Sequence, residues 1–369
     1  MVNLRIGFTG ARRSVAFRHF AAFEGVENWA LTDPDKRNLA AGAEQLGIPP
    51  ERCFTELEPL LDSGINVLVA ASPMPFHVPQ AVAALERDIH VLSEVTAAVN
   101  LAQCRDLVRA VRRSKAKYMM AENYVFAKVI RLVGEIVKAG LFGDPYYAEG
   151  EYIHNVESLF RNPDGSPTWR MTWQTGRNGI TYGTHSLGPC LSWLGERVVS
   201  VSCVGSGVHT MPDNKMEDSV VMLCKTERGH LVRIRQDIVS HRPHCMGYYS
   251  LQGTKGCYEA PRAPGDYDRI WLADRHSNDA DKWHSLWEFE EEFLPKEWRE
   301  LGEVAAKTGH GGGDFLEVHA FIESIRNDTN PPIDVYTALD WTLPGLMSEQ
   351  SIALGGAPVI VPDPRTTLF

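Results

Sequence analysis

The sequence predicts an α/β protein in which a doubly wound parallel sheet is followed by a second α/β domain with an open, mainly antiparallel sheet. Two observations predict this fold. Up to about residue 125, short and wholly apolar runs alternate with segments of helical periodicity. Beyond that point the strand-like runs are longer and alternate between apolar and polar residues. Strands that are apolar on both sides are typical of parallel sheets covered by helices, and alternation is typical of antiparallel sheets with one exposed face.

The N-terminal strands and helices can be placed from these patterns. The predicted strands cover residues 4–8, 29–32, 66–71, 90–92 and 118–121. The helices between them cover residues 15–24, 36–46, 78–85 and 101–114. Strands that alternate with helices in this way form a parallel sheet with right-handed crossovers.

The rest of the chain follows a different plan. A helix over residues 127–139 ends at Gly140, and a late helix covers residues 315–325. The longer predicted strands cover residues 146–154, 198–205, 219–225, 230–239 and 248–253. Residues 160–180 and 260–310 are rich in polar residues, Pro, Gly and Trp, and are predicted to be long loops. The predicted domains are therefore residues 1–124 and residues 125–369.

Charge and cysteine content exclude several classes of protein. The 369 residues carry a formal net charge of -10, so we expect no nucleic-acid partner and no binding to an anionic membrane. The seven cysteines are too widely spaced for a disulfide framework or a zinc ribbon, which favours a cytoplasmic protein. His241, His244 and Cys245 are types of residue that bind transition metals. A short stretch that contains Pro rarely supplies such a site alone, so no metal is predicted.

A turn after the first strand points to a dinucleotide. Gly7 and Gly10 bracket this turn, where the absence of a side chain lets the backbone approach a pyrophosphate. The full G-x-G-x-x-G pattern is not met, but Arg12 can compensate phosphate charge. Asp33 ends the second strand, where a carboxylate can accept both ribose hydroxyls, and Pro34 follows it in place of an arginine. NAD is therefore predicted over NADP, although an ordinary tight turn and a helix N-cap are the structural alternatives.

Several motifs together resemble the Gfo/Idh/MocA oxidoreductases, and the resemblance covers nearly the whole chain. The late segment His310-Gly-Gly-Gly-Asp314 belongs to it, as does the ending Gly355–Asp363. The resemblance implies an N-terminal Rossmann domain, a C-terminal α/β domain with an open sheet, and NAD as the cofactor. The residues that it implies for cofactor binding are Gly7, Gly10, Arg12, Asp33, Ser72, Pro73, His77, Glu94 and Asn123.

Two departures from that family's pattern lead to a narrower resemblance. Val95 stands where the family's Glu-Lys-Pro signature has its lysine, and Thr181 stands where an aspartate precedes the histidine at position 185. The chain is more similar to the NAD-dependent glycosidases of glycoside hydrolase family 109, the α-N-acetylgalactosaminidase group. The corresponding active-site positions are Glu122, Tyr152, Arg170, Tyr182 and His185.

The resemblance suggests a role for each of these residues. His185 is the expected general acid/base because histidine titrates nearest to neutral pH. Tyr152 and Tyr182 can donate to an oxyanion or act as bases. The predicted substrate-binding residues are Glu122, Arg170, His154 and His310.

Each of these residues also has a plain structural alternative. A lone histidine is often structural, and His310 can simply start the helix that follows it. A strand tyrosine such as Tyr152 is often packing, and Tyr182 can cap a loop. Arg170 can form a surface cation–π pair with Trp169.

The function implied is the cleavage of a sugar derivative by hydride transfer at a ring carbon. Oxidation by NAD⁺, proton removal at the adjacent carbon, elimination, hydration and re-reduction would follow one another without net redox change. The alternatives are an NAD-dependent sugar or cyclitol dehydrogenase or glycoside 3-oxidase, and a non-catalytic ligand-sensing protein. A homodimer or homotetramer through the open sheet of the second domain is expected, because its alternating apolar residues would otherwise be exposed.

Overall fold

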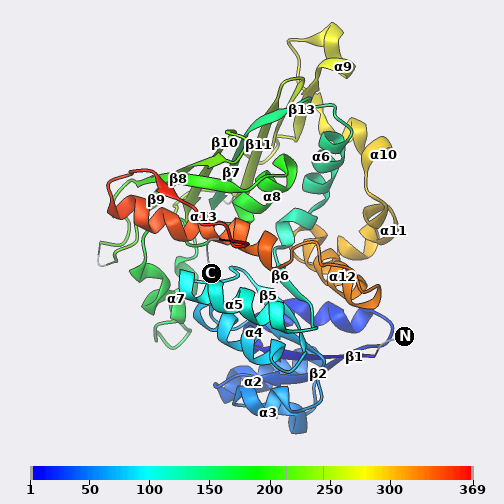
Figure 1. Ribbon diagram of the computed structural model, residues 1–369, viewed down its shortest axis with the longest axis vertical. Coiled ribbons are helices and arrows are strands. Elements are labelled where there is room, and N and C mark those ends of the chain that lie inside the picture. Colours follow the sequence, from blue (N-terminus) through cyan, green and yellow to red (C-terminus); the bar gives the residue numbers. More distant parts are fainter. Residues whose placement is uncertain (1–2, 213, 244, 367–369) are drawn as a thin grey trace. The chain divides into compact units, whose positions relative to one another are not determined.

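The protein divides into two compact units (Figure 1). The computed structural model describes residues 3–212, 214–243 and 245–366. One unit comprises Met1–Phe126, Leu301–Leu339 and Pro364–Phe369, and the other comprises Ala127–Glu300 and Asp340–Asp363. The chain therefore returns to the first unit after completing most of the second. The simple division after residue 124 stays a prediction.

The first unit contains a parallel sheet of six strands. Its order is β3-β2-β1-β4-β5-β6, and all of its pairings are parallel. The strands are β1 (Leu4–Thr9), β2 (Val26–Thr32), β3 (Cys53–Phe54), β4 (Val67–Ala70), β5 (His90–Glu94) and β6 (Tyr118–Ala121). The predicted doubly wound sheet is confirmed. The two-residue β3 was missed because it is too short for a hydrophobic pattern.

Helices connect these strands, and their ends follow from local chemistry. The connecting helices are α2 (Lys36–Leu46), α3 (Leu57–Leu61), α4 (His77–Leu85) and α5 (Leu101–Arg113); α12 (Gly313–Arg326) joins this unit later in the chain. Asp35 caps α2 by accepting a hydrogen bond from Arg37 N at 2.8 Å. The first predicted helix, 15–24, is helical at that place but is not an α-helix. The segment is α1 (Ala11–Ser14) followed by a 3₁₀ helix over Val15–Ala22, because Gly10 takes a left-handed conformation and starts the helix directly behind it.

The second unit is built on a sheet of nine strands. The order is β14-β13-β12-β11-β7-β10-β9-β8-β15, and only the β7–β10 pair is parallel among the described pairings. The longer strands are β7 (Pro145–Ile153), β8 (Val198–Gly205), β9 (Ser219–Thr226), β10 (Leu231–Asp237) and β11 (Cys245–Gly253). The shorter ones are β12 (Gly256–Glu259), β13 (Arg269–Leu272), β14 (His284–Ser285) and β15 (Val359–Ile360). This confirms the prediction of a mainly antiparallel sheet.

Helix α8 (Thr184–Leu194) packs against β7 and β11 (Figure 1). The contact requires glycine at position 150 of β7. A Cβ there would lie 2.7 Å from the backbone oxygen of Ser186, well inside van der Waals contact. This close approach sets α8 directly over the strand that carries Tyr152. The unit also contains α6 (Lys128–Lys138), α7 (Trp169–Thr172) and most of the long α13 (Val335–Ala353), whose first turn belongs to the first unit.

The prediction of a loop over residues 260–310 is wrong. The segment contains β13, α9 (Ala273–His276), β14, α10 (Glu290–Phe293) and α11 (Lys296–Ala305). Most of these elements have four residues or fewer, so no periodicity identifies them. Residues 160–180 hold only α7 and short 3₁₀ turns. Within the described ranges, no helix has both the length and the apolar character needed to cross a bilayer.

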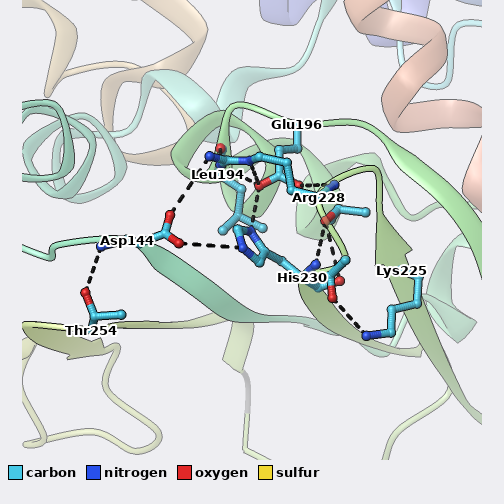
Figure 2. A network of polar contacts seen from close by, with 9 residues as sticks. Asp144, Leu194, Glu196, Lys225, Arg228, His230 and Thr254 are labelled. Atoms are coloured by element: carbon cyan, nitrogen blue, oxygen red, sulfur yellow. Dashed lines mark hydrogen bonds and ion pairs between the residues drawn. The ribbon is translucent and has the colours of Figure 1, made fainter.

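A buried carboxylate fixes the turn between β9 and β10 in the second unit (Figure 2). The side chain of Glu196 is 2% exposed and accepts from Arg228 Nε and His230 Nδ1, both at 2.7 Å. Asp144 Oδ2 lies 3.9 Å from Nε2 of the same histidine, so the ring sits between two carboxylates. Burial disfavours the ionised form, but hydrogen bonds from Thr226, Arg228 and His230 outweigh it and lower the pKa of Glu196.

Candidate active site

The first part of the site is the turn after β1. Gly10 has a φ of 78°, and a Cβ at this position would lie 2.5 Å from the backbone oxygen of Ala71 at the end of β4. The close approach of the two turns leaves a surface without side chains, which suits a pyrophosphate. Gly7 lies inside β1, where a Cβ would meet the side chain of Ile65 at 2.6 Å, so a glycine is also needed here for packing. Arg12 is exposed in α1.

Asp33 lies beside this turn. Its two carboxylate oxygens accept from the backbone N–H groups of Ala11 and Asp35, each at 2.9 Å, and the residue is 8% exposed. Asp35, and not Asp33, caps α2, so the N-cap alternative for Asp33 is wrong. Arg37 pairs with Asp35 at 3.2 Å. A carboxylate held beside a side-chain-free turn therefore fits NAD, and the nearest following arginine is already paired with a carboxylate.

The turn after β4 contains three further predicted residues. Ser72 accepts a hydrogen bond from Gln80 at 2.9 Å, and Pro73 precedes the 3₁₀ turn Met74–Phe76. The ring nitrogens of His77 lie 2.7 Å from Ser72 O and 3.2 Å from Thr96 O, and the residue is 1% exposed. Burial lowers the pKa of His77. This histidine connects two turns at the carboxyl edge of the sheet, and its direct contact with a cofactor stays a prediction.

The ends of β5 and β6 bring acidic residues together with α12. Glu94 ends β5 and pairs with Arg13, and Glu122 follows β6 in the buried interior. Asn123 Nδ2 donates to Asp314 of α12 at 2.7 Å, and His310 Nδ1 donates to the same carboxylate at 2.8 Å. Burial opposes ionisation of Asp314. Hydrogen bonds from His310 and Asn123, and the charges of His310 and Arg13, nevertheless lower its pKa.

The second unit brings four of the predicted catalytic and substrate residues into one aromatic cluster. The ring of His185 lies 5.0 Å from that of Tyr182 and 5.3 Å from that of Tyr152, centroid to centroid. The two tyrosine rings are 5.6 Å apart. The Tyr152 hydroxyl and Nδ1 of His154 form a hydrogen bond of 3.0 Å. Tyr152, Tyr182, His185 and His154 form the catalytic cluster discussed below.

The catalytic cluster forms in a different way from the one the sequence predicted. The three-residue spacing of Tyr182 and His185 predicts that both lie on one face of a helix, but α8 begins at Thr184. The tyrosine lies before the helix, where its backbone N–H donates to Oε1 of Gln236 at 3.0 Å. Tyr249 donates to the backbone oxygen of His185 at 2.6 Å. Gln236 and Tyr249 were missed, because neither lies in a motif and both act through the backbone.

Arg170 and a group of potential metal ligands lie outside the catalytic cluster. The guanidinium of Arg170 lies 4.4 Å from the ring centroid of Trp169, which is the cation–π contact considered from sequence. Among the described residues, His276, His284 and Glu288 have potential ligand atoms within 4.8 Å of one another. However, Nδ1 of His276 accepts from the backbone N–H of Leu272 at 3.0 Å, so Nε2 carries the proton in the neutral ring and is unsuited to a metal. His244 lies outside the described residues.

Comparisons with known proteins identify the family of each part of the chain. Residues 4–122 match the model of the oxidoreductase family with an NAD-binding Rossmann fold. Residues 127–367 match the model of the C-terminal domain of glycosyl hydrolase 109. A glycosyl hydrolase family 109 protein of Saccharopolyspora erythraea is 30% identical, over 98% of this chain and 83% of that protein. The α-N-acetylgalactosaminidase of Tannerella forsythia is 27% identical, over 98% and 86%.

A solved structure shows the same fold. Levoglucosan dehydrogenase, in complex with NADH and L-sorbose, superposes with a TM-score of 0.82 at 18% identity, covering 99% of this chain and 100% of that one. NAD is the cofactor, as indicated by the Gly10 turn, the adjacent Asp33 and the match to the NAD-binding model. The chain is thus an NAD-dependent enzyme, and it belongs to glycosyl hydrolase family 109.

Proposed function

We propose that this enzyme cleaves a glycoside by transient oxidation of a ring carbon, followed by elimination, hydration and re-reduction. When bound, NAD supplies the acceptor and then the donor of the hydride, so no net oxidation occurs. The observation that carries the proposal is the catalytic cluster of the second unit, in which the rings of Tyr152, Tyr182 and His185 lie within 5.6 Å of one another. Family membership and the name of the Tannerella relative support a glycoside as substrate.

The residues of the catalytic cluster divide the proton transfers among them. His185 takes the proton of the C3 hydroxyl while the ring carbon is oxidised. Tyr182 or Tyr152 removes the C2 proton, which the neighbouring ketone makes acidic, and His154 orients Tyr152 through the 3.0 Å hydrogen bond. Arg170 and Glu122 hold substrate oxygens, and His310 contributes to substrate binding.

Val95 supports this chemistry over a simple dehydrogenation. It is 3% exposed and follows Glu94 directly, at the position where the related oxidoreductases carry a lysine. An apolar side chain transfers no proton, so proton transfer is left to the histidine and the tyrosines. The residues proposed for NAD are Gly7, Gly10, Arg12, Asp33, Ser72, Pro73, His77, Glu94 and Asn123.

The main experiment compares two products. The enzyme is mixed with NAD⁺ and a chromogenic α-N-acetylgalactosaminide, and both the released aglycone and NADH absorbance are followed. Aglycone release without accumulation of NADH is expected. Stoichiometric NADH without aglycone would instead establish the second candidate function, that of a sugar or cyclitol dehydrogenase or glycoside 3-oxidase. The fold shared with levoglucosan dehydrogenase supports this alternative.

We further propose a homodimer or homotetramer through the open face of the second sheet. Val204 of β8 and Leu223 of β9 are 57% and 46% exposed, and apolar strand residues of this kind favour burial against another subunit. Sedimentation of the wild type against Leu223→Glu tests this, and an unchanged mass would contradict it. The wide spacing of the cysteines supports a cytoplasmic location.

A further inference from the structure

Four carboxyl groups lie buried in the first unit, and they come from three elements. Glu94 ends β5, Glu122 follows β6, and Asp314 and Glu317 lie one turn apart on α12; their exposed fractions are 6%, 0%, 6% and 1%. We call these four residues the acidic cluster. The 2.7 Å hydrogen bond from Asn123, the neighbour of Glu122, to Asp314 ties the end of β6 to α12, and Arg13, which pairs with Glu94, also acts electrostatically on Asp314.

The positive charge around the acidic cluster falls short of the negative charge. Arg13 of α1 pairs with Glu94, and its side chain is 42% exposed. His310 donates to Asp314, and His19 of the 3₁₀ helix Val15–Ala22 interacts electrostatically with that same carboxylate. Four carboxyl groups thus face one arginine and two histidines. Low exposure makes this imbalance costly, because buried charges need partners.

Glu317 relieves part of this cost by remaining protonated. Burial, followed by the charges of Asp314 and Glu94, raises its pKa well above the usual value, with Arg13 opposing them. Its Oε2 atom has no hydrogen-bond partner among the described residues. The same holds for Oδ1 of Asn123, a residue that is 98% buried. The Nδ2 atom of the same side chain is hydrogen-bonded to Asp314. Two buried polar atoms without partners indicate that a further group completes this region.

The topology indicates which group this is. In a sheet of order 3-2-1-4-5-6, a dinucleotide binds at the carboxyl edge, where the order reverses between β1 and β4. Asp33, the residue suited to a ribose, lies at the end of β2 on one side of the reversal. The acidic cluster lies at the ends of β5 and β6 on the other side, and this half takes the other nucleotide of NAD, the one that carries nicotinamide. That ring is cationic in NAD⁺ and neutral in NADH.

We propose that Glu317 couples its own protonation to the charge of the bound nicotinamide. Binding of NAD⁺ brings a positive charge to the acidic cluster, and Glu317 releases its proton to solvent as it becomes a carboxylate. Binding of NADH brings no such charge, and Glu317 keeps its proton. Reduction of the bound cofactor is therefore accompanied by the uptake of one proton on this carboxyl group, which balances the charge that the ring loses. The proposal rests on NAD binding and does not depend on glycoside cleavage.

Calorimetric binding of NAD⁺ and of NADH tests the proposal without any turnover. Titrations in phosphate and in Tris, which differ in ionisation enthalpy, give the number of protons released. Between pH 6 and 8 we expect close to one proton released per NAD⁺ and none per NADH. As pH rises, the dissociation constant of NAD⁺ should fall by up to about tenfold per pH unit, and that of NADH should stay constant.

Two variants on the same helix make the test specific. Glu317→Gln keeps the shape and neutrality of the protonated acid, so it should fold, abolish proton release and remove the pH dependence of NAD⁺ binding. Glu323→Gln is the matched control, because this residue is on α12 with a 40% exposed side chain paired with Arg326, and it should behave like the wild type. Equal proton release for NAD⁺ and NADH, or unchanged release in Glu317→Gln, would overturn the proposal; the latter would assign the proton to another group such as His310.

Discussion

Replacement of His185 by alanine tests the proposed chemistry at a single side chain. The ring is 5% exposed and lies 5.0 Å from Tyr182 and 5.3 Å from Tyr152, so its loss removes the member of the catalytic cluster that contacts both tyrosines. A positioned general acid–base group contributes about 10²–10⁴-fold, which corresponds to ~2.7–5.5 kcal/mol in the barrier. We expect His185→Ala to lose turnover by a factor in this range.

The structure also predicts what this substitution leaves intact. Tyr249 bonds to the backbone oxygen of His185 and not to its ring, so the start of α8 stays anchored. NAD affinity should change little, because the cofactor residues lie in the other unit. The double variant with Tyr182→Phe should lose much less than the product of the two single losses, since the two groups act as a unit.

Steady-state kinetics on a cleaved glycoside decide the matter. His209→Ala is a suitable control, because it removes an exposed histidine from the same unit. Circular dichroism confirms that each variant is folded. Near-normal turnover in His185→Ala would refute the reasoning, would make the histidine structural, and would leave Tyr152 as the next candidate base.

Four further predictions follow from the described contacts. Asp33→Ala should weaken NAD binding by about 1.5–3 kcal/mol in a calorimetric titration, and tighter binding of NADP than NAD by the wild type would contradict the role of this carboxylate. Val95→Ala should keep its turnover; loss of turnover with intact folding and NAD affinity would show that this position takes part in the chemistry. Glu196→Gln should destabilise the fold by about 1–2 kcal/mol near pH 7, because charge-assisted hydrogen bonds become neutral ones. The lowered pKa of Glu196 means that this stability is present above the unfolded value of 4.5 and is lost as pH falls through the folded pKa, so urea denaturation should show the two proteins converging in acid. Glu317 has a raised pKa, so its contribution to the free energy of unfolding is present below its unfolded pKa of 4.5 and is lost as pH rises. Between pH 5 and 8 the stability of Glu317→Gln should therefore fall less than that of the wild type.

The sequence was sufficient for the fold wherever hydrophobic patterns were long enough. The wholly apolar runs at β1, β4 and β6 predicted a parallel sheet because both of its faces are covered. The alternating pattern of β9 and β10 predicted one exposed face. The region from β13 to α11 failed because elements of two to four residues have no period, and α13 was missed because Pro344 and Gly345 interrupt its pattern.

Site residues could be predicted from the sequence where their side chains take part directly in the chemistry. They could not be predicted where their role depends on a backbone hydrogen bond or on burial. Tyr152, Tyr182 and His185 lie together, although the helical spacing expected to join them was the wrong reason. Gln236 holds Tyr182 through its main chain, which no motif records. Glu317 has the sequence environment of an ordinary helical glutamate, and only its place on the buried side of α12 makes it a buried acid.

The most direct test of the central claim is the fate of the C2 hydrogen during cleavage. The reaction is run in D₂O with NAD⁺ and an α-N-acetylgalactosaminide, and the released sugar is analysed by NMR and mass spectrometry. Oxidation, elimination and hydration require the C2–H bond to break, so the account predicts one deuterium at C2 in the product and no accumulation of NADH. A released sugar that retains its C2 hydrogen would show direct hydrolysis and would contradict the account.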